Sequence, residues 1–124
     1  MLKSIIAIAV GSASGGILRW LLSTRFNFLY AIPFGTLVSN LIAGYIIGFA
    51  MNYFSNLPNI APEWRLLIIT GFCGGLSTFS TFSAEVVTFF QKGDISLAMG
   101  TIFVHLFGSL LMTFLGILTY QYLK

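Results

Sequence analysis

Charged side chains are scarce in this sequence: six of its 124 residues are Lys or Arg and three are Asp or Glu. A soluble domain carries about 25% charged residues, and it needs polar surface to cover its core. The composition therefore excludes a water-soluble domain. The six basic residues are scattered and form no basic stripe, which argues against a nucleic-acid-binding protein. The single cysteine, Cys73, excludes a disulfide scaffold and a multi-cysteine metal site.

Apolar residues dominate instead, at 57% of the chain, and the mean hydropathy is +0.95. A helix that crosses a bilayer needs about 20 mostly apolar residues. Four such stretches are present, at residues 2–24, 32–54, 64–91 and 96–122. A membrane β-barrel is excluded because it needs at least about eight alternating segments. The sequence therefore predicts an all-α integral membrane protein, with residues 1–124 forming a single four-helix transmembrane domain. The first stretch is not a cleavable signal peptide, because it continues past Arg19 without a cleavage site.

The basic residues are balanced between the two ends of the predicted helices, so they set no orientation in the membrane. Either this rule fails here, or the chain inserts in both orientations and forms antiparallel dimers. Glycine pairs at four-residue spacing let helices approach closely in lipid, within one subunit or between two. The residues concerned are Lys3, Arg65 and Lys124 at one end, Arg25, Lys92 and Arg19 at the other, and the pairs Gly11–Gly15 and Gly44–Gly48.

Polar residues inside the predicted spans are costly in lipid and are therefore functional candidates. In the second span, Thr36 and Asn40 share a stripe of small and polar residues. The Asn40 amide either forms an interhelical hydrogen bond or donates to a permeating ion. The fourth span carries a winding row of polar residues at four-residue steps. The row consists of Thr101, His105, Ser109 and Thr113.

Two charged side chains also lie inside predicted spans. Arg19 either extends toward the membrane surface or lines a vestibule that attracts anions. Glu85 is the only acid well inside a span, where it either pairs with a base or forms part of a vestibule. His105 has no second His or paired carboxylate beside it with which to bind a metal.

The third span has the least regular sequence of the four. Three glycines within residues 71–75 and a hydroxyl-rich run after them should break the helix at mid-membrane. Such a break is tolerated only where the freed backbone is buried or lines a cavity, and its carbonyls can bind a cation. Phe79 and Phe82 follow the glycines as helical neighbours. The two rings either pack in the core or present their partially positive edges to a small anion.

Three motifs carry a resemblance to a known family. They are Gly-x-x-x-Arg at Gly15–Arg19, Gly-Thr-Leu-x-x-Asn at Gly35–Asn40, and Gly-Phe-Cys-Gly-Gly-Leu-Ser-Thr-Phe-Ser-Thr-Phe at Gly71–Phe82. With these motifs the sequence resembles the Fluc/CrcB family of fluoride channels over essentially the whole chain. The resemblance implies a multi-pass protein of the bacterial inner membrane, an antiparallel, dual-topology homodimer with two fluoride pores at the subunit interface.

The resemblance also implies which residues do the work. A structural Na⁺ at the dimer centre would be held by the backbone carbonyls of Gly74 and Ser77 from both subunits, although the family commonly has Thr in place of Ser77. No organic cofactor is implied. Arg19, Thr36 and Glu85 would line a vestibule or support the site. Each pore would use Asn40, Phe79, Phe82, Ser80, Thr81, His105, Ser109 and Thr113.

Passive conduction agrees with the residues themselves. Fluoride is strongly hydrated, so a channel needs a series of neutral donors that replace its water without a fixed cation to trap it. The chain has no nucleotide-binding motif and no proton-relay carboxylates, which predicts electrogenic fluoride efflux and fluoride resistance. An enzyme is excluded because no nucleophile–base pair or metal cluster can be assembled. One alternative is a small multidrug or cation exporter, which needs a pore carboxylate that the first two spans lack. Another is a structural membrane-assembly protein, which explains the glycines but not the polar rows.

Overall fold

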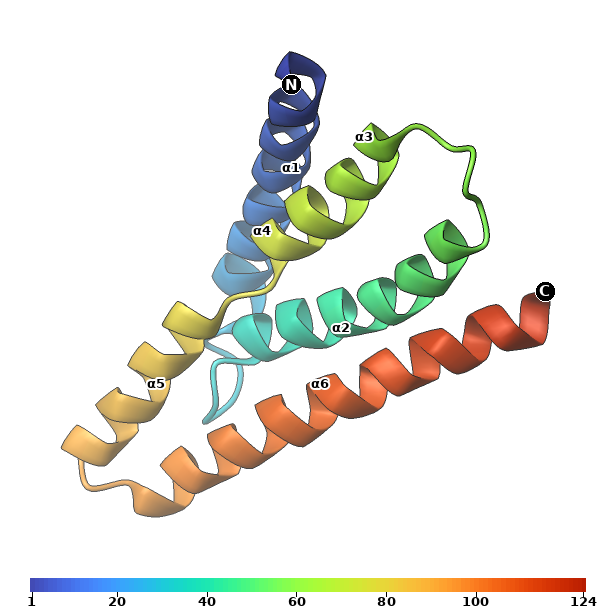
Figure 1. The fold of residues 1–124 in the computed structure, drawn as a ribbon. Coiled ribbons are helices and arrows are strands. Elements are labelled where there is room, and N and C mark those ends of the chain that lie inside the picture. Colours follow the sequence, from blue (N-terminus) through green and yellow to red (C-terminus); the bar gives the residue numbers. More distant parts are fainter.

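The computed structural model describes all of residues 1–124, and all of its secondary-structure elements are helices (Figure 1). The first, second and last membrane segments are the continuous helices α1 (Leu2–Phe26), α2 (Phe34–Ser55) and α6 (Ile95–Leu123). With the broken segment Pro62–Gln91, they make four helical stretches long and apolar enough to cross a membrane. The ends of these four helical stretches differ from those of the predicted spans by no more than two residues.

The third membrane segment is interrupted, as its sequence indicated. It comprises α3 (Pro62–Arg65), the π-helix η1 (Leu66–Cys73), α4 (Gly74–Leu76) and α5 (Phe79–Gln91). Ser77 and Thr78 between α4 and α5 are extended, with φ/ψ of −81°/154° and −151°/120°. The glycines at residues 71–75 remain helical, and the interruption begins at Ser77, after Leu76. Sequence reasoning did not predict the π-helix, a form with one more residue per hydrogen-bonded turn than the α-helix.

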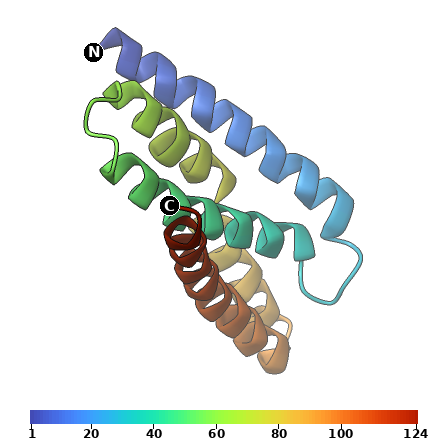
Figure 2. The ribbon, with the colours of Figure 1, turned by 90° about the vertical axis from the view of Figure 1, so that its right-hand side faces the viewer.

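The helices pack in two groups. The α1 helix lies along η1 and α4, while α2 packs against α6 (Figures 1 and 2). The α5 helix turns back onto α6 through residues 92–94, and Gly93 there has a φ of 81°, which favours glycine. The break in the third segment therefore lies where both groups meet, beside α1, α2 and α6.

The glycine pairs allow close helix contacts inside this one chain. A Cβ atom on Gly15 would lie 2.2 Å from the Phe72 carbonyl oxygen of η1. A Cβ atom on Gly48 would lie 2.1 Å from the Thr113 carbonyl oxygen of α6. Of the two possibilities left open by the sequence, these pairs therefore serve packing within the subunit.

Candidate functional site

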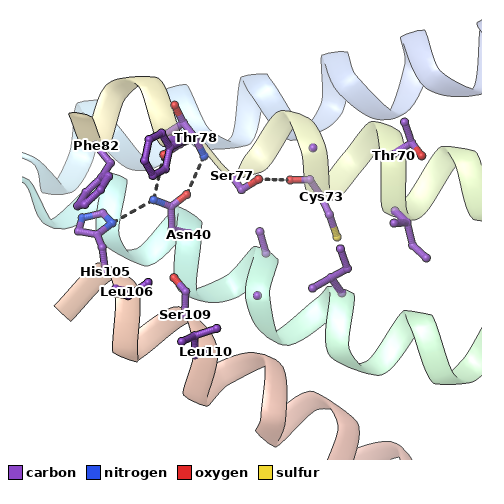
Figure 3. Close-up of a pocket in the computed structure, with 16 residues that line it drawn as sticks. Asn40, Thr70, Cys73, Ser77, Thr78, Phe82, His105, Leu106, Ser109 and Leu110 are labelled. Carbon is purple, nitrogen blue, oxygen red and sulfur yellow. Dashed lines mark hydrogen bonds between the residues drawn. The ribbon is translucent and has the colours of Figure 1, made fainter. Parts of the chain in front are cut away.

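A cavity of about 460 Å³ lies beside the break in the third segment, between α2, η1, α4, α5 and α6 (Figure 3). None of the side chains that line it is Asp, Glu, Lys or Arg. The cavity brings together most of the residues that the sequence singled out for a pore and a cation site. These are Asn40, Phe79, Phe82, His105 and Ser109, with Gly74 and Ser77.

Asn40 of α2 joins the break to α6. Its Oδ1 accepts a hydrogen bond from the Thr78 backbone N–H at 2.7 Å, and its Nδ2 donates to the Thr78 carbonyl oxygen at 3.2 Å. The same Nδ2 lies 3.0 Å from His105 Nδ1 (Figure 3). Asn40 therefore forms hydrogen bonds to two neighbouring segments, the break and α6, and it also lines the cavity.

An aromatic cluster borders this hydrogen-bonded group. The Phe82 and His105 ring centroids are 4.7 Å apart, and the Phe82 and Phe79 centroids are 5.5 Å apart with the planes tilted by 59°. His105 is only 4% exposed and its Nε2 has no hydrogen-bond partner, whereas Phe79 is 77% exposed. Phe79 therefore lies on the open side of the cavity, and His105 lies at its closed side.

Two backbone carbonyls at the break have lost their helical donors. In a continuous α-helix the N–H of Thr78 would donate to Gly74, and that of Thr81 to Ser77. Here these N–H groups donate to Asn40 Oδ1 and to Thr78 Oγ1. No side chain donates to the carbonyl oxygens of Gly74 or Ser77, and both residues line the cavity. Uncapped carbonyl oxygens are hard ligands suited to a cation such as Na⁺, so these residues fit the implied sodium site.

Arg19 supports the same break from α1. Its Nε donates to the Gly75 carbonyl oxygen at 3.1 Å, and the side chain is half-buried. The Nε atom thus lies against the backbone of the break, and the roles considered for Arg19 at the membrane surface or in a vestibule stay predictions. The Gly75 carbonyl has also lost its helical partner, because its donor would be Phe79 beyond the extended residues. Arg19 caps the end of α4 and leaves the neighbouring carbonyls uncapped.

A second polar group lies at the α1–α2 end of the molecule. Thr36 Oγ1 donates to Glu85 Oε2 at 2.7 Å, and the Thr36 backbone N–H donates to Asn27 Oδ1 at 3.0 Å. Glu85 Oε1 is buried without a hydrogen-bond partner. Glu85 therefore accepts a hydrogen bond from the Thr36 hydroxyl. The sequence alone had left open that Glu85 pairs with a base. Sequence reasoning missed Asn27, although an Asn between two helices is a common backbone-capping residue.

The remaining candidates lie outside the cavity lining. The Ser80 hydroxyl is 3.3 Å from Thr78 Oγ1, and the Thr113 hydroxyl donates to the Ser109 carbonyl of its own helix. Pore roles for Ser80, Thr81 and Thr113 stay predictions. Thr78 was not singled out from the sequence, yet its side chain caps α5. Its signal was available, because a Thr before a helical run is a typical N-cap.

Comparison of the sequence with known proteins shows to which family the chain belongs. The family described as "CrcB-like protein, Camphor Resistance (CrcB)" matches residues 6–117. The chain belongs to the CrcB family. It is 58% identical, over all of its length and 98% of the relative's, to the "Fluoride-specific ion channel FluC" of Nitrosomonas europaea. It is also 58% identical to the protein of that name from Pseudomonas aeruginosa, over 99% of this chain and 98% of the relative. The same name belongs to a Chromobacterium violaceum relative that is 56% identical over the whole chain. These CrcB relatives bear the name of a channel, and the chain is a membrane protein of that family and not an enzyme.

Proposed function

We propose that this protein is a fluoride-selective ion channel that gives passive, electrogenic fluoride efflux across the bacterial inner membrane and so confers fluoride resistance. One observation carries the proposal. The cavity at the helix break offers hydroxyl, amide and imidazole groups and two phenyl rings, and no charged side chain lines it. Such neutral groups can replace the water of a small anion without holding it too tightly to leave. The names of the CrcB relatives support the same substrate.

The working unit in this proposal is an antiparallel homodimer with two pores. A backbone break is not stable against lipid, because its freed polar groups need protein or water around them. Gly74, Ser77 and Phe79 are nevertheless exposed in the single chain. A second copy of the chain would cover them and close the cavity. The even distribution of basic residues between the two membrane faces supports insertion in both orientations.

A sodium ion at the dimer centre belongs to the same proposal. The Gly74 and Ser77 carbonyl oxygens are the ligands that each subunit would supply, because their helical donors are engaged elsewhere. The positive charge of the ion would hold the broken third segments of the two subunits together. Within each subunit, Arg19 and Asn40 fix the backbone next to each of these carbonyls by binding the Gly75 and Thr78 oxygens.

The experiment is fluoride efflux from liposomes that contain the purified protein, followed with a fluoride electrode while valinomycin carries the potassium counter-current. We expect fast fluoride loss, and no chloride loss from matched chloride-loaded vesicles. Phe79→Ile and Phe82→Ile should each slow fluoride efflux, because they remove the polarised ring edges. Phe103→Ile on the exposed face of α6 is the control and should leave efflux unchanged. No fluoride loss from folded wild-type protein would refute the proposal.

A further inference from the structure

A second cavity, an apolar groove, lies beside the C-terminal half of α2. It has a volume of about 400 Å³, and seven of the eight residues that line it are hydrophobic. Six of the eight belong to α2, while η1 contributes Ile68 and α6 contributes Thr119. The groove shares no residue with the cavity at the break. We call it the α2 groove.

The α2 groove and the cavity at the break lie on different faces of α2. The α2 residues that line the cavity at the break are Asn40, Ala43, Gly44 and Ile47. Those that line the groove at the same spacing are Ile46, Phe49, Ala50 and Tyr53. A shift of six residues turns the lining by about 120° around the helix, because successive residues of an α-helix are about 100° apart. In the dimer proposed above, the second copy covers the break, and the groove is left facing the acyl chains of the bilayer.

The two half-buried hydroxyl groups of the groove are bonded within the protein. The Tyr45 hydroxyl donates to Thr119 Oγ1 at 2.6 Å, and Thr119 Oγ1 donates to the Leu115 carbonyl oxygen at 2.8 Å. The remaining hydroxyl belongs to Tyr53, which is 43% exposed. The inner walls therefore have no free donor for water or a polar ligand, whereas an apolar chain would gain dispersion contacts there.

The groove extends toward the membrane end at which α2 and α6 finish. The Tyr53 and Tyr120 ring centroids are 6.4 Å apart there, and tyrosine is typical of the boundary between membrane and water. Arg65 lies three residues before Ile68, which is about one helical turn. Lys124 lies one turn after Tyr120, whose carbonyl oxygen accepts from the Lys124 backbone N–H. Both basic residues are exposed, at the level where lipid headgroups lie.

The charge at this membrane end is positive. It carries Lys3, Arg65 and Lys124, against one acidic residue, Glu63. Glu63 lies two residues before Arg65, and residues two apart point to different sides of a helix. A negatively charged headgroup above the groove would therefore be attracted by Arg65 and Lys124.

We propose that the α2 groove binds an acyl chain of an anionic phospholipid whose phosphate lies against Arg65 and Lys124. The walls supply van der Waals contact for the chain, and the two basic residues supply the preference for a negative headgroup. The bound chain contacts α2, η1 and α6, the segments that also surround the cavity at the break. The site is separate from the ion pathway, so it does not depend on which ion the protein conducts.

A tryptophan on the groove wall can report the bound chain. Trp20→Phe, Trp64→Phe and Tyr53→Trp combined leave one tryptophan, which lines the groove. The variant is placed in phosphatidylcholine vesicles with a small fraction of brominated phosphatidylglycerol or brominated phosphatidylcholine, because bromine quenches a tryptophan in contact with it. One basic residue near the surface favours an anionic lipid by about fivefold. Brominated phosphatidylglycerol should therefore reach half-maximal quenching at a fraction at least about fivefold lower, and high salt should reduce this difference.

Charge-removing variants in the reporter protein test the headgroup contact. Arg65→Gln combined with Lys124→Gln should abolish the preference for phosphatidylglycerol, while brominated phosphatidylcholine still quenches. Arg25→Gln combined with Lys92→Gln removes the same charge from the opposite membrane end and should keep the preference. A preference that survives in the first pair, or is lost equally in both pairs, would contradict the role of Arg65 and Lys124.

A groove-filling variant tests the position of the chain. Ile46→Phe enlarges a side chain that lines the groove, and it should reduce quenching by both brominated lipids. Ile6→Phe on the exposed face of α1 is the control and should leave quenching unchanged. Equal quenching in the two variants would show that the chain lies outside the groove and would overturn the proposal.

Two further outcomes would also overturn it. Equal quenching of the reporter by the two lipids would indicate ordinary boundary lipid without a site, and no quenching by either would indicate that a second copy covers the groove. If the reporter variant does not fold, Trp20→Phe alone leaves Trp64, which is 53% exposed and four residues before Ile68, with the same expected order of the two lipids. The measurement contains no fluoride, so its failure leaves the proposed channel standing, and absent fluoride efflux leaves the lipid site standing.

Discussion

Two adjacent glycines of α1 provide a matched pair of substitutions with opposite expected effects. A Cβ atom on Gly15 would lie 2.2 Å from the Phe72 carbonyl oxygen and 2.7 Å from the Leu76 backbone nitrogen. A Cβ atom on Gly16 would have no other atom within 4 Å. Gly15 is therefore the position where α1 approaches the backbone of the broken segment most closely, while Gly16 has open space beside it.

The magnitude follows from these distances. Ordinary van der Waals contact begins at 3.4 Å, so Gly15→Ala must separate α1 from η1 by about 1 Å. Such overpacking against rigid backbone costs about 1–3 kcal/mol, and we expect a loss near the upper end of this range. Gly16→Ala meets no such contact and gains up to about 1 kcal/mol from the better helix propensity of Ala.

The assay is unfolding in detergent, with far-UV circular dichroism following heat or sodium dodecyl sulfate at one fixed protein concentration. Gly15→Ala should unfold at a lower midpoint than the wild type, and Gly16→Ala at the same or a higher midpoint. A fully stable Gly15→Ala protein would refute the close contact between α1 and η1. Equal destabilisation by both substitutions would refute the assignment of Gly15 as the contact residue.

Two further predictions concern the polar side chains that hold the segments together. Thr36→Val removes the hydroxyl that donates to Glu85 and should destabilise the fold by about 1–3 kcal/mol. Thr24→Val, which loses only an exposed bond to its own helix, should change the unfolding midpoint little. Arg19→Met removes the cap on the last turn before the helix break and should also destabilise the fold by about 1–3 kcal/mol, which lowers the midpoint. Arg25→Met at the exposed end of α1 is its control, and equal midpoints for the two Arg variants would contradict the capping role.

The membrane architecture could be predicted from the sequence because it depends on composition averaged over long stretches. About 20 apolar residues suffice to predict a span, and all four spans were found in this way. The interruption of the third span was also predictable, since glycines and hydroxyl residues at mid-membrane weaken a helix. Its position at Ser77 and Thr78 was not, because the glycines before it remain helical, with Gly71 and Gly75 packed against the backbone of α1.

The candidate site was predictable in its residues but not in its bonding. Asn40 and His105 were singled out separately, because each is a polar side chain in a predicted span. Their contact depends on how α2 and α6 pack, which sequence spacing within either helix does not specify. Asn27 and Thr78 were missed although both are residue types typical of helix ends, and Thr78 forms a local cap with the Thr81 backbone N–H. The inward turn of Arg19 likewise follows from the exposed carbonyl of Gly75, a product of the break itself.

Ion selectivity in a planar bilayer tests the central claim most directly. With unequal concentrations of potassium fluoride on the two sides, potassium chloride added so that potassium is equal on both, and the purified protein in the membrane, the reversal potential reports which ions carry the current. We predict a reversal potential close to the equilibrium potential of fluoride, and no measurable current when both sides contain chloride alone. A reversal potential set by chloride or potassium, or the absence of current from correctly inserted protein, would contradict the account.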